Sequence, residues 1–200
     1  MTDQWALVKD GVIIEYRDYP PANDQSSLAP GKPRMLPVVE ERAEYDSASE
    51  ALDGPDTIIG ATQVTKRWTK RAKTQSEIDA MVASVDARLE KEFERRWTAP
   101  IAHTINGVEY MWHADRDAVT NIMGVMMSAQ AAGIGTGTAR TWTPIGSNVG
   151  VQVTIADVIA LGLAIAQRKD ALFATKKLRQ AALKTMSPSD LAVYDVGAGW

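Results

Sequence analysis

The segment His113-Ala-Asp-Arg-Asp117 holds side chains that could bind a divalent cation. It offers one imidazole and two carboxylates, and a second imidazole, His103, precedes it in the chain. Nitrogen and oxygen ligands of this kind suit divalent metals. Helix capping accounts for the two aspartates without a metal. Asp115 stands where a helix needs an N-cap, and Asp117 suits the positive end of the helix dipole. No second ligand cluster occurs elsewhere, so we expect no metal site and interpret both histidines as ordinary residues of two opposite strands.

A second candidate is the glycine-rich run Gly133-Ile-Gly-Thr-Gly137. Glycines allow a backbone to approach a phosphate closely. A dinucleotide-binding loop, however, follows a strand and opens a helix, and a P-loop ends in Gly-Lys-Ser or Gly-Lys-Thr. This run follows an expected helix and contains no lysine. We therefore expect a helix C-terminus here and no cofactor.

Nucleophilic catalysis has little support in the composition. The chain contains no cysteine and only two histidines, so a catalytic triad would need His103 or His113. No serine or threonine stands in the sequence context of a nucleophile elbow. The sequence therefore predicts a protein without catalytic residues that is not an enzyme.

Basic residues surround Trp68 within residues 64–75, a segment without acids: Lys66, Arg67, Lys70, Arg71 and Lys73. Cations for phosphates and an aromatic ring for stacking are typical of a surface for single-stranded nucleic acid. The other interpretation is a solvated strand face, or a partner for the acidic residues of 40–56. The net charge of the chain is -3. We therefore expect no nucleic acid partner.

The elements that position these side chains begin with a β-rich docking region, residues 1–75. Two β-rich runs within residues 5–16 meet at Asp10-Gly11, a dipeptide that favours a type I′ turn, and predict a hairpin. Between residues 19 and 37 repeated prolines exclude a helix or a central strand. We expect an extended surface connection there. The β-branched residues of 57–69 predict a strand.

A connecting helix is predicted over residues 76–99. Ser76 offers an N-cap that is followed by acids in the first turn. Apolar residues then recur every three or four positions, as on an amphipathic helix: Ile78, Val82, Val85, Leu89, Phe93 and Trp97. The helix should end before Pro100.

A hairpin and two helices are predicted over residues 101–186, which makes the fold class α+β. Asn106-Gly107 indicates the turn of the hairpin. Asp115 caps the first helix, and residues 138–150 form a linker that contains Trp142. Thr154 and Asp157 resemble a capping box for the second helix, which runs to about Met186. The apolar faces of the two helices contain Val119, Ile122, Met123 and Met126, and then Ile155, Val158, Ile159, Ile165, Leu172 and Phe173. The C-terminal tail, residues 187–200, is apolar enough to dock on another surface.

Residues 101–186 resemble a family of unknown function, DUF4376, that is widespread among bacteriophage tail and tail-fibre proteins. The resemblance lies in Asn106-Gly-Val-Glu-Tyr110, the Met- and Ala-rich helix from Asp115 to Gly133, Trp142, and Val151-Gln-Val-Thr154 before the long helix. Its motifs are structural and transfer no catalytic residue. The resemblance implies a role in virion assembly, which composition and spacing alone do not indicate.

Two functions follow from this resemblance as hypotheses. The first is a structural protein of the distal phage tail, as a fibre, hub or adaptor located in the virion. The second is a tail-fibre assembly chaperone that is absent from the mature particle. In both, the partners are other phage tail proteins and further copies of the chain, with a trimer expected, and contact with the host surface is indirect. A third class, a metal-dependent enzyme using His103, His113 and Asp115, predicts bound metal.

The N-terminus lacks the basic and then apolar layout of a signal peptide, and the apolar runs are too short to span a bilayer. We therefore expect synthesis in the host cytoplasm and no membrane insertion.

Overall fold

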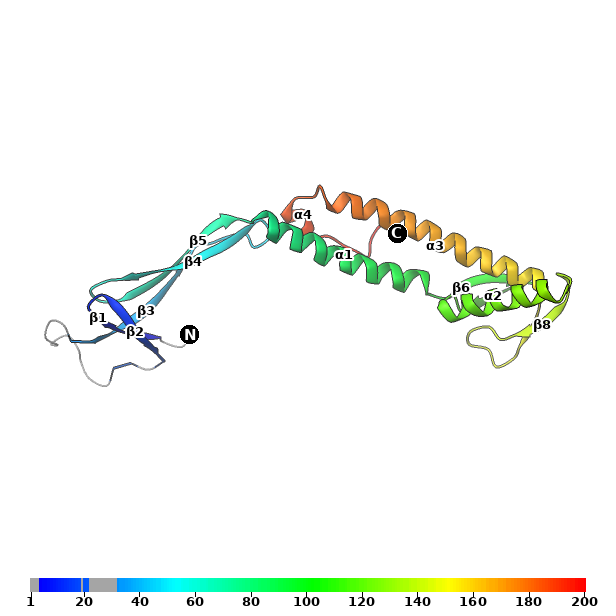
Figure 1. Ribbon diagram of the computed structural model, residues 1–200, viewed down its shortest axis with the longest axis horizontal. Coiled ribbons are helices and arrows are strands. Elements are labelled where there is room, and N and C mark those ends of the chain that lie inside the picture. Colours follow the sequence, from blue (N-terminus) through cyan, green and yellow to red (C-terminus); the bar gives the residue numbers. More distant parts are fainter. Residues whose placement is uncertain (1–3, 19, 22–31) are drawn as a thin grey trace. The chain divides into compact units, whose positions relative to one another are not determined.

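The computed structural model describes residues 4–18, 20–21 and 32–200, and the chain divides into two compact units, residues 1–78 and 79–200 (Figure 1). The first unit is a β-sheet, and the second combines helices with two β-hairpins. The predicted α+β class, with a β-rich N-terminal part, a helix and a C-terminal hairpin with helices, is confirmed. Much of the proline-rich connection predicted within 19–37 lies outside the described residues.

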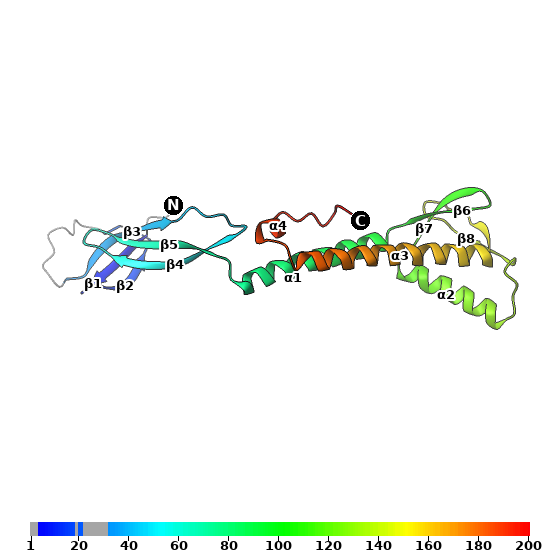
Figure 2. The same ribbon diagram turned by 90° about the horizontal axis from the view of Figure 1, so that it is seen from above.

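The first unit holds a five-stranded sheet with the strand order β2-β1-β3-β5-β4 (Figure 2). β1 (Trp5–Lys9) and β2 (Val12–Arg17) pair as an antiparallel hairpin. Asp10 and Gly11 have φ values of 50° and 75°, and a type I′ turn needs positive φ at both of these positions. The predicted hairpin is confirmed.

β3 (Arg34–Arg42) corrects the expectation that prolines exclude a central strand before residue 38. It lies in the middle of the sheet, antiparallel to β1 over residues 34–37 and parallel to β5 over residues 38–42. The Val38 nitrogen donates to the Gln4 oxygen at 2.8 Å, on the β1 side. Since N–H groups of neighbouring residues point to opposite sides of a strand, the Pro37 nitrogen faces the β5 side. Pairing with β5 begins only at Val38, so Pro37 lacks its N–H where the ladder does not need one.

β4 (Glu50–Ile59) and β5 (Val64–Ala72) form an antiparallel hairpin. The prediction of one strand over 57–69 is wrong, because the chain turns within it: the Gly60 nitrogen donates to the Gln63 oxygen at 2.9 Å. The pairing of β4 with β5 is irregular between Asp53 and Asp56. The intervening Gly54 has a φ of 116°, a backbone conformation that favours glycine.

Acidic and basic segments face each other within this unit, one of the two arrangements that the charge pattern left open. The Arg67 guanidinium lies 2.8 Å from the Glu41 carboxylate across β3 and β5. Lys70 lies 3.4 Å from Glu50. The core of the unit is small and consists of the buried Ala6, Val8, Leu36 and Val64, with Ile13, Val38 and Ile59 packed against them.

α1 (Gln75–Trp97) begins at Thr74 as its N-cap, and this corrects the assignment of Ser76. The Glu77 nitrogen donates to the Thr74 hydroxyl at 3.3 Å, and the Thr74 nitrogen donates to the Glu77 carboxylate at 2.7 Å. This reciprocal pair is a capping box, and it places Ser76 inside the first turn. The buried residues of α1 belong to the predicted apolar stripe: Val85, Leu89, Phe93 and Trp97.

α1 packs against α3 (Ile155–Leu183) in the second unit (Figure 1). Gln180 donates to Asp86 at 2.7 Å, and Lys176 donates to Glu90 at 2.9 Å. Nearer the start of α3, an Arg168 nitrogen donates to the Trp97 carbonyl at 2.6 Å. Residue numbers therefore rise along α1 as they fall along α3, and the two helices are antiparallel. From Asp79 onward the helix predicted as a connector belongs to the second unit.

β6 (Ile101–Ile105) and β7 (Val108–Trp112) form the predicted hairpin, with positive φ at Asn106 and Gly107. α2 (Arg116–Ala131) follows, and its Ala118 nitrogen donates to the side chain of the predicted N-cap, Asp115, at 2.9 Å. Both predictions are confirmed.

A second hairpin occupies the region that we expected to be a linker. β8 (Ala139–Trp142) pairs antiparallel with β9 (Val151–Thr154). Thr154 ends β9 and also caps α3, in a confirmed capping box with Asp157. The core between the hairpins, α2 and α3 contains Ile105, Trp112, Ala114, Ile122, Val153, Val158, Leu161 and Ile165.

The apolar stripe predicted for α3 is only partly correct. Ile155, Val158 and Ile165 are buried, but Ile159 and Phe173 are 37% and 46% exposed. α3 faces the hairpins and α2 near its start and faces α1 along its second half. Its buried side therefore changes along its length, and a single stripe does not describe it.

The C-terminal tail docks on the second unit itself. After the short helix α4 (Pro188–Ala192), which buries Leu191, the chain returns to α1 and α3. The expectation that the tail docks is confirmed, and the surface it covers belongs to its own chain. Within the described residues, no helix combines the length and apolar character needed to cross a membrane.

Candidate functional site

A groove of about 810 Å³ lies between α2 and β8 in the second unit. Three buried apolar residues of the core, Trp112, Ile122 and Leu161, line its base. Polar side chains line its walls: His113, Asp115, Asp117, Asn121 and Ser128 from the α2 side, and Arg140 and Thr143 from the β8 side. An apolar base with a few convergent polar groups is typical of a ligand site.

Arg140, which lines this groove, has one hydrogen-bond donor without an acceptor. Its Nε atom is buried and has no hydrogen-bond partner among the described residues. Asp115 and Asp117 line the same groove, yet neither carboxylate comes within ion-pair distance of Arg140 in the described structure. The guanidinium and the two carboxylates therefore line one groove without forming an ion pair with each other.

Two indole rings give the groove its aromatic character. The ring centroids of Trp112 and Trp142 are 6.4 Å apart, and Tyr110 meets Trp112 edge to face at 6.0 Å. The Trp112 Nε1 atom donates to the His103 carbonyl at 3.3 Å. Trp112 is therefore fixed in the core, whereas Trp142, which is only half-buried, faces the groove.

The residues considered for a metal site do not converge. His113 lies 3.8 Å from Asp115, at the groove, but His103 lies near Asp157 at the start of α3. The pKa of Asp157 is lowered mainly by hydrogen bonds from Thr154, and the charge of His103 adds to this effect. Over the described part of the chain, no group of three or more His, Asp or Glu residues is placed to hold a metal ion.

The glycine-rich run ends α2, as predicted. Gly133 has a φ of 64°, and the Ile134 nitrogen donates to the Ala129 carbonyl at 2.9 Å. This pairing across a glycine in the left-handed conformation is a Schellman motif. The run therefore supplies turn geometry at the helix end.

The basic residues around Trp68 contact side chains of their own unit. Lys66 donates to Gln4 at 2.7 Å and lies over the Tyr16 ring, and Arg71 forms a 2.7 Å ion pair with Glu77. The Trp68 ring is covered by the Arg42 guanidinium at 4.7 Å. These contacts support the interpretation that the basic segment serves as a partner for acidic and polar neighbours.

α2 and α3 enclose a second, purely apolar groove of about 390 Å³. Gly162 lets the helices approach, because a Cβ added there would lie 2.9 Å from the Ile122 Cγ2 atom. The exposed residues along the groove include Met123, Met126, Ile159 and Leu163. α2 buries only Ile122 and Ala129 among its 16 residues, so most of this helix is free to meet another surface.

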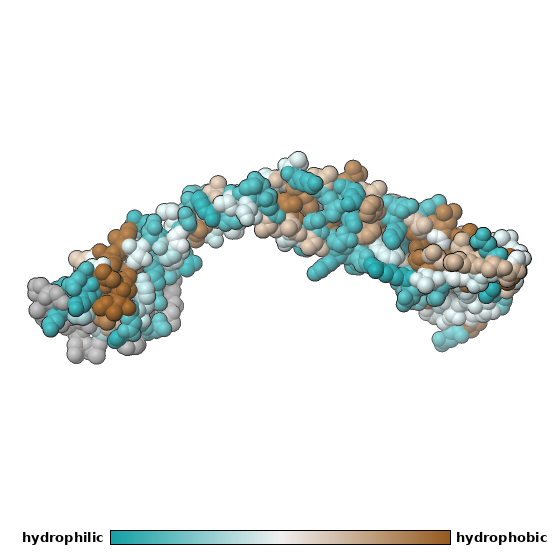
Figure 3. All heavy atoms as spheres, viewed as in Figure 1, coloured by the Kyte–Doolittle hydropathy of each residue, from teal (hydrophilic) through white to brown (hydrophobic). Residues whose placement is uncertain are grey.

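The first unit also exposes apolar residues, some of which are visible in Figure 3. Val12, Ile14 and Tyr16 are 64%, 55% and 40% exposed. They belong to β2, an edge strand of the sheet. The β1–β2 register shifts at Ile14, so Val12 (opposite Lys9) and Tyr16 (opposite Ala6) lie on opposite faces of the sheet. An edge strand with exposed apolar residues is a ready surface for another protein.

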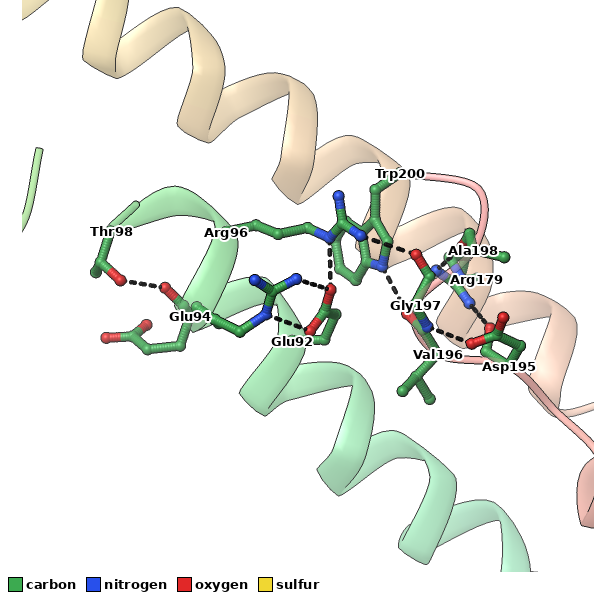
Figure 4. Close-up of polar contacts among 11 residues, drawn as sticks. Glu92, Glu94, Arg96, Thr98, Arg179, Asp195, Val196, Gly197, Ala198 and Trp200 are labelled. Atoms are coloured by element: carbon green, nitrogen blue, oxygen red, sulfur yellow. Dashed lines mark hydrogen bonds and ion pairs between the residues drawn. The ribbon is translucent and has the colours of Figure 1, made fainter. Parts of the chain in front are cut away.

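A polar network fastens the tail to α1 and α3 (Figure 4). Glu92 accepts hydrogen bonds from Arg95 and Arg96, both at 2.6 Å, and these bonds lower the pKa of Glu92 to about 2. Arg96 also donates to the Gly197 carbonyl at 2.8 Å. Arg179 on α3 donates to the carbonyls of Asp195, Val196 and Ala198.

The cations of α3 contribute to this packing. Lys176 is only 6% exposed, and its Nζ atom lies 2.9 Å from Glu90 and 4.1 Å from the centre of the Phe93 ring. Phe93 in turn stacks against Trp200 at 6.5 Å. Lys176 and Arg179 are structural residues that sequence reasoning did not identify, since lysine and arginine are rarely buried.

Comparison with known families gives one match. The model of the family described as a domain of unknown function (DUF4376) matches residues 83–197, and the chain belongs to this family. The match is wider than the 101–186 expected, because it includes much of α1 and most of the tail. The packing of both against α3 gives a physical reason for this extent. No curated protein and no solved structure matches the chain.

Proposed function

We propose that this chain is a non-catalytic assembly protein of the distal bacteriophage tail, acting as a fibre, hub or adaptor component of the virion. The resemblance of the C-terminal module to tail-associated proteins supports this role, and the description of the family itself names no function. The proposal includes other tail proteins as partners and synthesis in the host cytoplasm. Contact with the host surface would be indirect.

The observation that carries the proposal is the poor burial of α2. A helix that buries two of its 16 residues and exposes Met123, Met126 and Met127 gains little from packing within its own chain. The apolar groove beside it is suited to the same helix face of a second copy, in a homo-oligomer for which a trimer is our expectation. The exposed apolar residues of the edge strand β2 would then be available for a different tail protein.

An assembly chaperone is the alternative, and the exposed methionines favour it. Methionine side chains adapt to irregular partners and are common on surfaces that bind several partners in turn. In this case the chain would bind a tail fibre transiently and would be absent from the mature particle.

Mass spectrometry of purified particles separates the two roles. We expect the chain at a fixed ratio to the major tail proteins in particles of the phage that encodes it. A replication protein of the same phage is the control, and it should be absent from these particles. Particles that lack the chain, while it co-purifies with free tail fibres, would establish the chaperone. Its absence from both fractions would refute the whole proposal.

A further inference from the structure

We propose that the groove between α2 and β8 binds a neutral saccharide. This groove is distinct from the apolar one between α2 and α3, because polar side chains line its walls. Its volume of about 810 Å³ lies within the range of ligand pockets in proteins. The inference does not depend on a role in tail assembly.

The charges of the groove select the chemistry of the ligand. Arg140 lines the groove, and a guanidinium group can only donate hydrogen bonds. Asp115 and Asp117 line the same groove from the α2 side, and carboxylates only accept hydrogen bonds. An anion would meet Arg140 but would be repelled by the two carboxylates. An ammonium group would meet the carboxylates but would be repelled by Arg140.

Hydroxyl groups resolve this conflict, because each one both donates and accepts. A ligand with several hydroxyls can donate to Asp117 and accept from Arg140 without carrying charge. Asn121 has a side-chain amide, which is also both donor and acceptor, and it lines the same groove from the α2 side. Planar polar groups of this kind form paired hydrogen bonds with neighbouring hydroxyls.

The aromatic base supports the same ligand class. A sugar ring has a polar rim of hydroxyls and an apolar face of C–H groups, and the latter packs on an aromatic face. Trp142 and Trp112 both line the groove, with their ring centroids 6.4 Å apart. From Asp117 to Ser128 the groove follows α2 for about three turns, which is long enough for more than one sugar ring.

The first experiment applies the full chain to an array of immobilised glycans that includes neutral, sialylated and sulfated members. We expect binding to neutral oligosaccharides. Calorimetry with the best neutral glycan should then give nearly the same affinity at low and high salt, because no net charge is neutralised. Binding confined to sialylated or sulfated glycans, or no glycan binding at all, would overturn the proposal.

Paired variants locate the binding site. Arg140→Ala and Asn121→Ala should each weaken the affinity for that glycan about tenfold or more, as expected for loss of a charged or bidentate hydrogen bond. Arg88→Ala and Asn148→Ala, at exposed positions away from the groove, are the matched controls and should bind like the unmodified chain. Circular dichroism checks that each variant is folded. Full affinity in folded Arg140→Ala and Asn121→Ala would refute the assignment to this groove.

Discussion

Cationic side chains hold the second unit together at the scale of single residues. Arg168 donates to the carbonyls of Trp97, Ala99 and Pro100, where α1 ends. The fork of a guanidinium can serve several acceptors at once, and burial lowers the pKa of Arg168. The last carbonyls of a helix have no N–H partner within the helix. Arg168 of α3 supplies the missing donors at the end of α1.

Glu92 gives a pH-dependent prediction at this scale. Its pKa is lowered from the usual 4.5 to about 2 by hydrogen bonds from Arg95 and Arg96. A lowered pKa in the folded state means that Glu92 adds stability above about pH 4.5 and loses this contribution as the pH falls toward 2. Glu92→Gln should therefore lower the melting temperature near neutral pH, and its difference from the unmodified chain should shrink as the pH falls through this window.

Calorimetric melting at a series of pH values between neutral and about 2.5 measures this difference. Glu109→Gln, at an exposed position of β7, is the control and should show little effect at any pH. A Glu92→Gln difference that stays constant with pH would contradict the prediction.

Local chemistry determined which residue roles could be predicted from the sequence. Asp115 and Thr154 are recognisable as caps, because their partners lie three residues away. Arg140 and Lys176 are not recognisable, because their surroundings come from distant segments of the chain. The groove at Arg140 was not predicted: His113, Asp115 and Asp117 were considered together only for a metal site, which we did not expect, and nothing local connects these residues to β8.

At the scale of elements, the short turns were predictable and the longer connections were not. Asp10-Gly11 and Asn106-Gly107 specify two-residue hairpins through their positive φ values. The β8–β9 hairpin has a connection over residues 143–150 that contains Pro144 and Gly146, so no local signal joins its strands. β4 contains acids, Gly54 and Pro55, which are depleted in strands, and its pairing with β5 overrides this tendency.

Gly54 provides a prediction for the β4–β5 hairpin. Its φ is 116°, and a Cβ at this position would lie 2.9 Å from the Arg67 carbonyl oxygen. Gly54→Ala should destabilise the first unit by about 2–3 kcal/mol, because strain and a backbone clash add together. Urea unfolding followed by circular dichroism measures the loss.

Gly11→Ala is the matched control for this substitution. Gly11 also has positive φ, but an added Cβ would meet nothing within 4 Å. Its cost should be strain alone, about 1 kcal/mol. Equal losses for the two variants would show that the close approach at Arg67 has no energetic effect.

At the scale of the whole molecule, association should depend on the groove between α2 and α3. Leu163 lies in this groove and is 57% exposed. We expect the unmodified chain, of 21.7 kDa, to form a larger species, about 65 kDa for three copies. Leu163→Glu should reduce the measured mass to that of one chain, because association would bury the new charge. Size-exclusion chromatography with light scattering gives the masses.

Val193→Glu is the control for the change in charge. Val193 is 80% exposed but lies outside the groove, so the variant should keep the mass of the unmodified chain. A single-chain mass for the unmodified protein, or an unchanged mass for Leu163→Glu, would contradict association through this surface.

The two-sided pairing of β3 has a consequence for the cooperativity of the first unit. Residues 34–37 of β3 hold the β1–β2 hairpin, and residues 38–42 hold the β4–β5 hairpin. The hairpins thus share one strand but use different residues of it, and Pro37 offers no amide hydrogen to bridge the two halves. The hydrophobic core instead joins them, because it contains Ala6 and Val8 of β1 and Val64 of β5 in one cluster. Amide hydrogens of β1 and β4 should therefore exchange with solvent as one cooperative group.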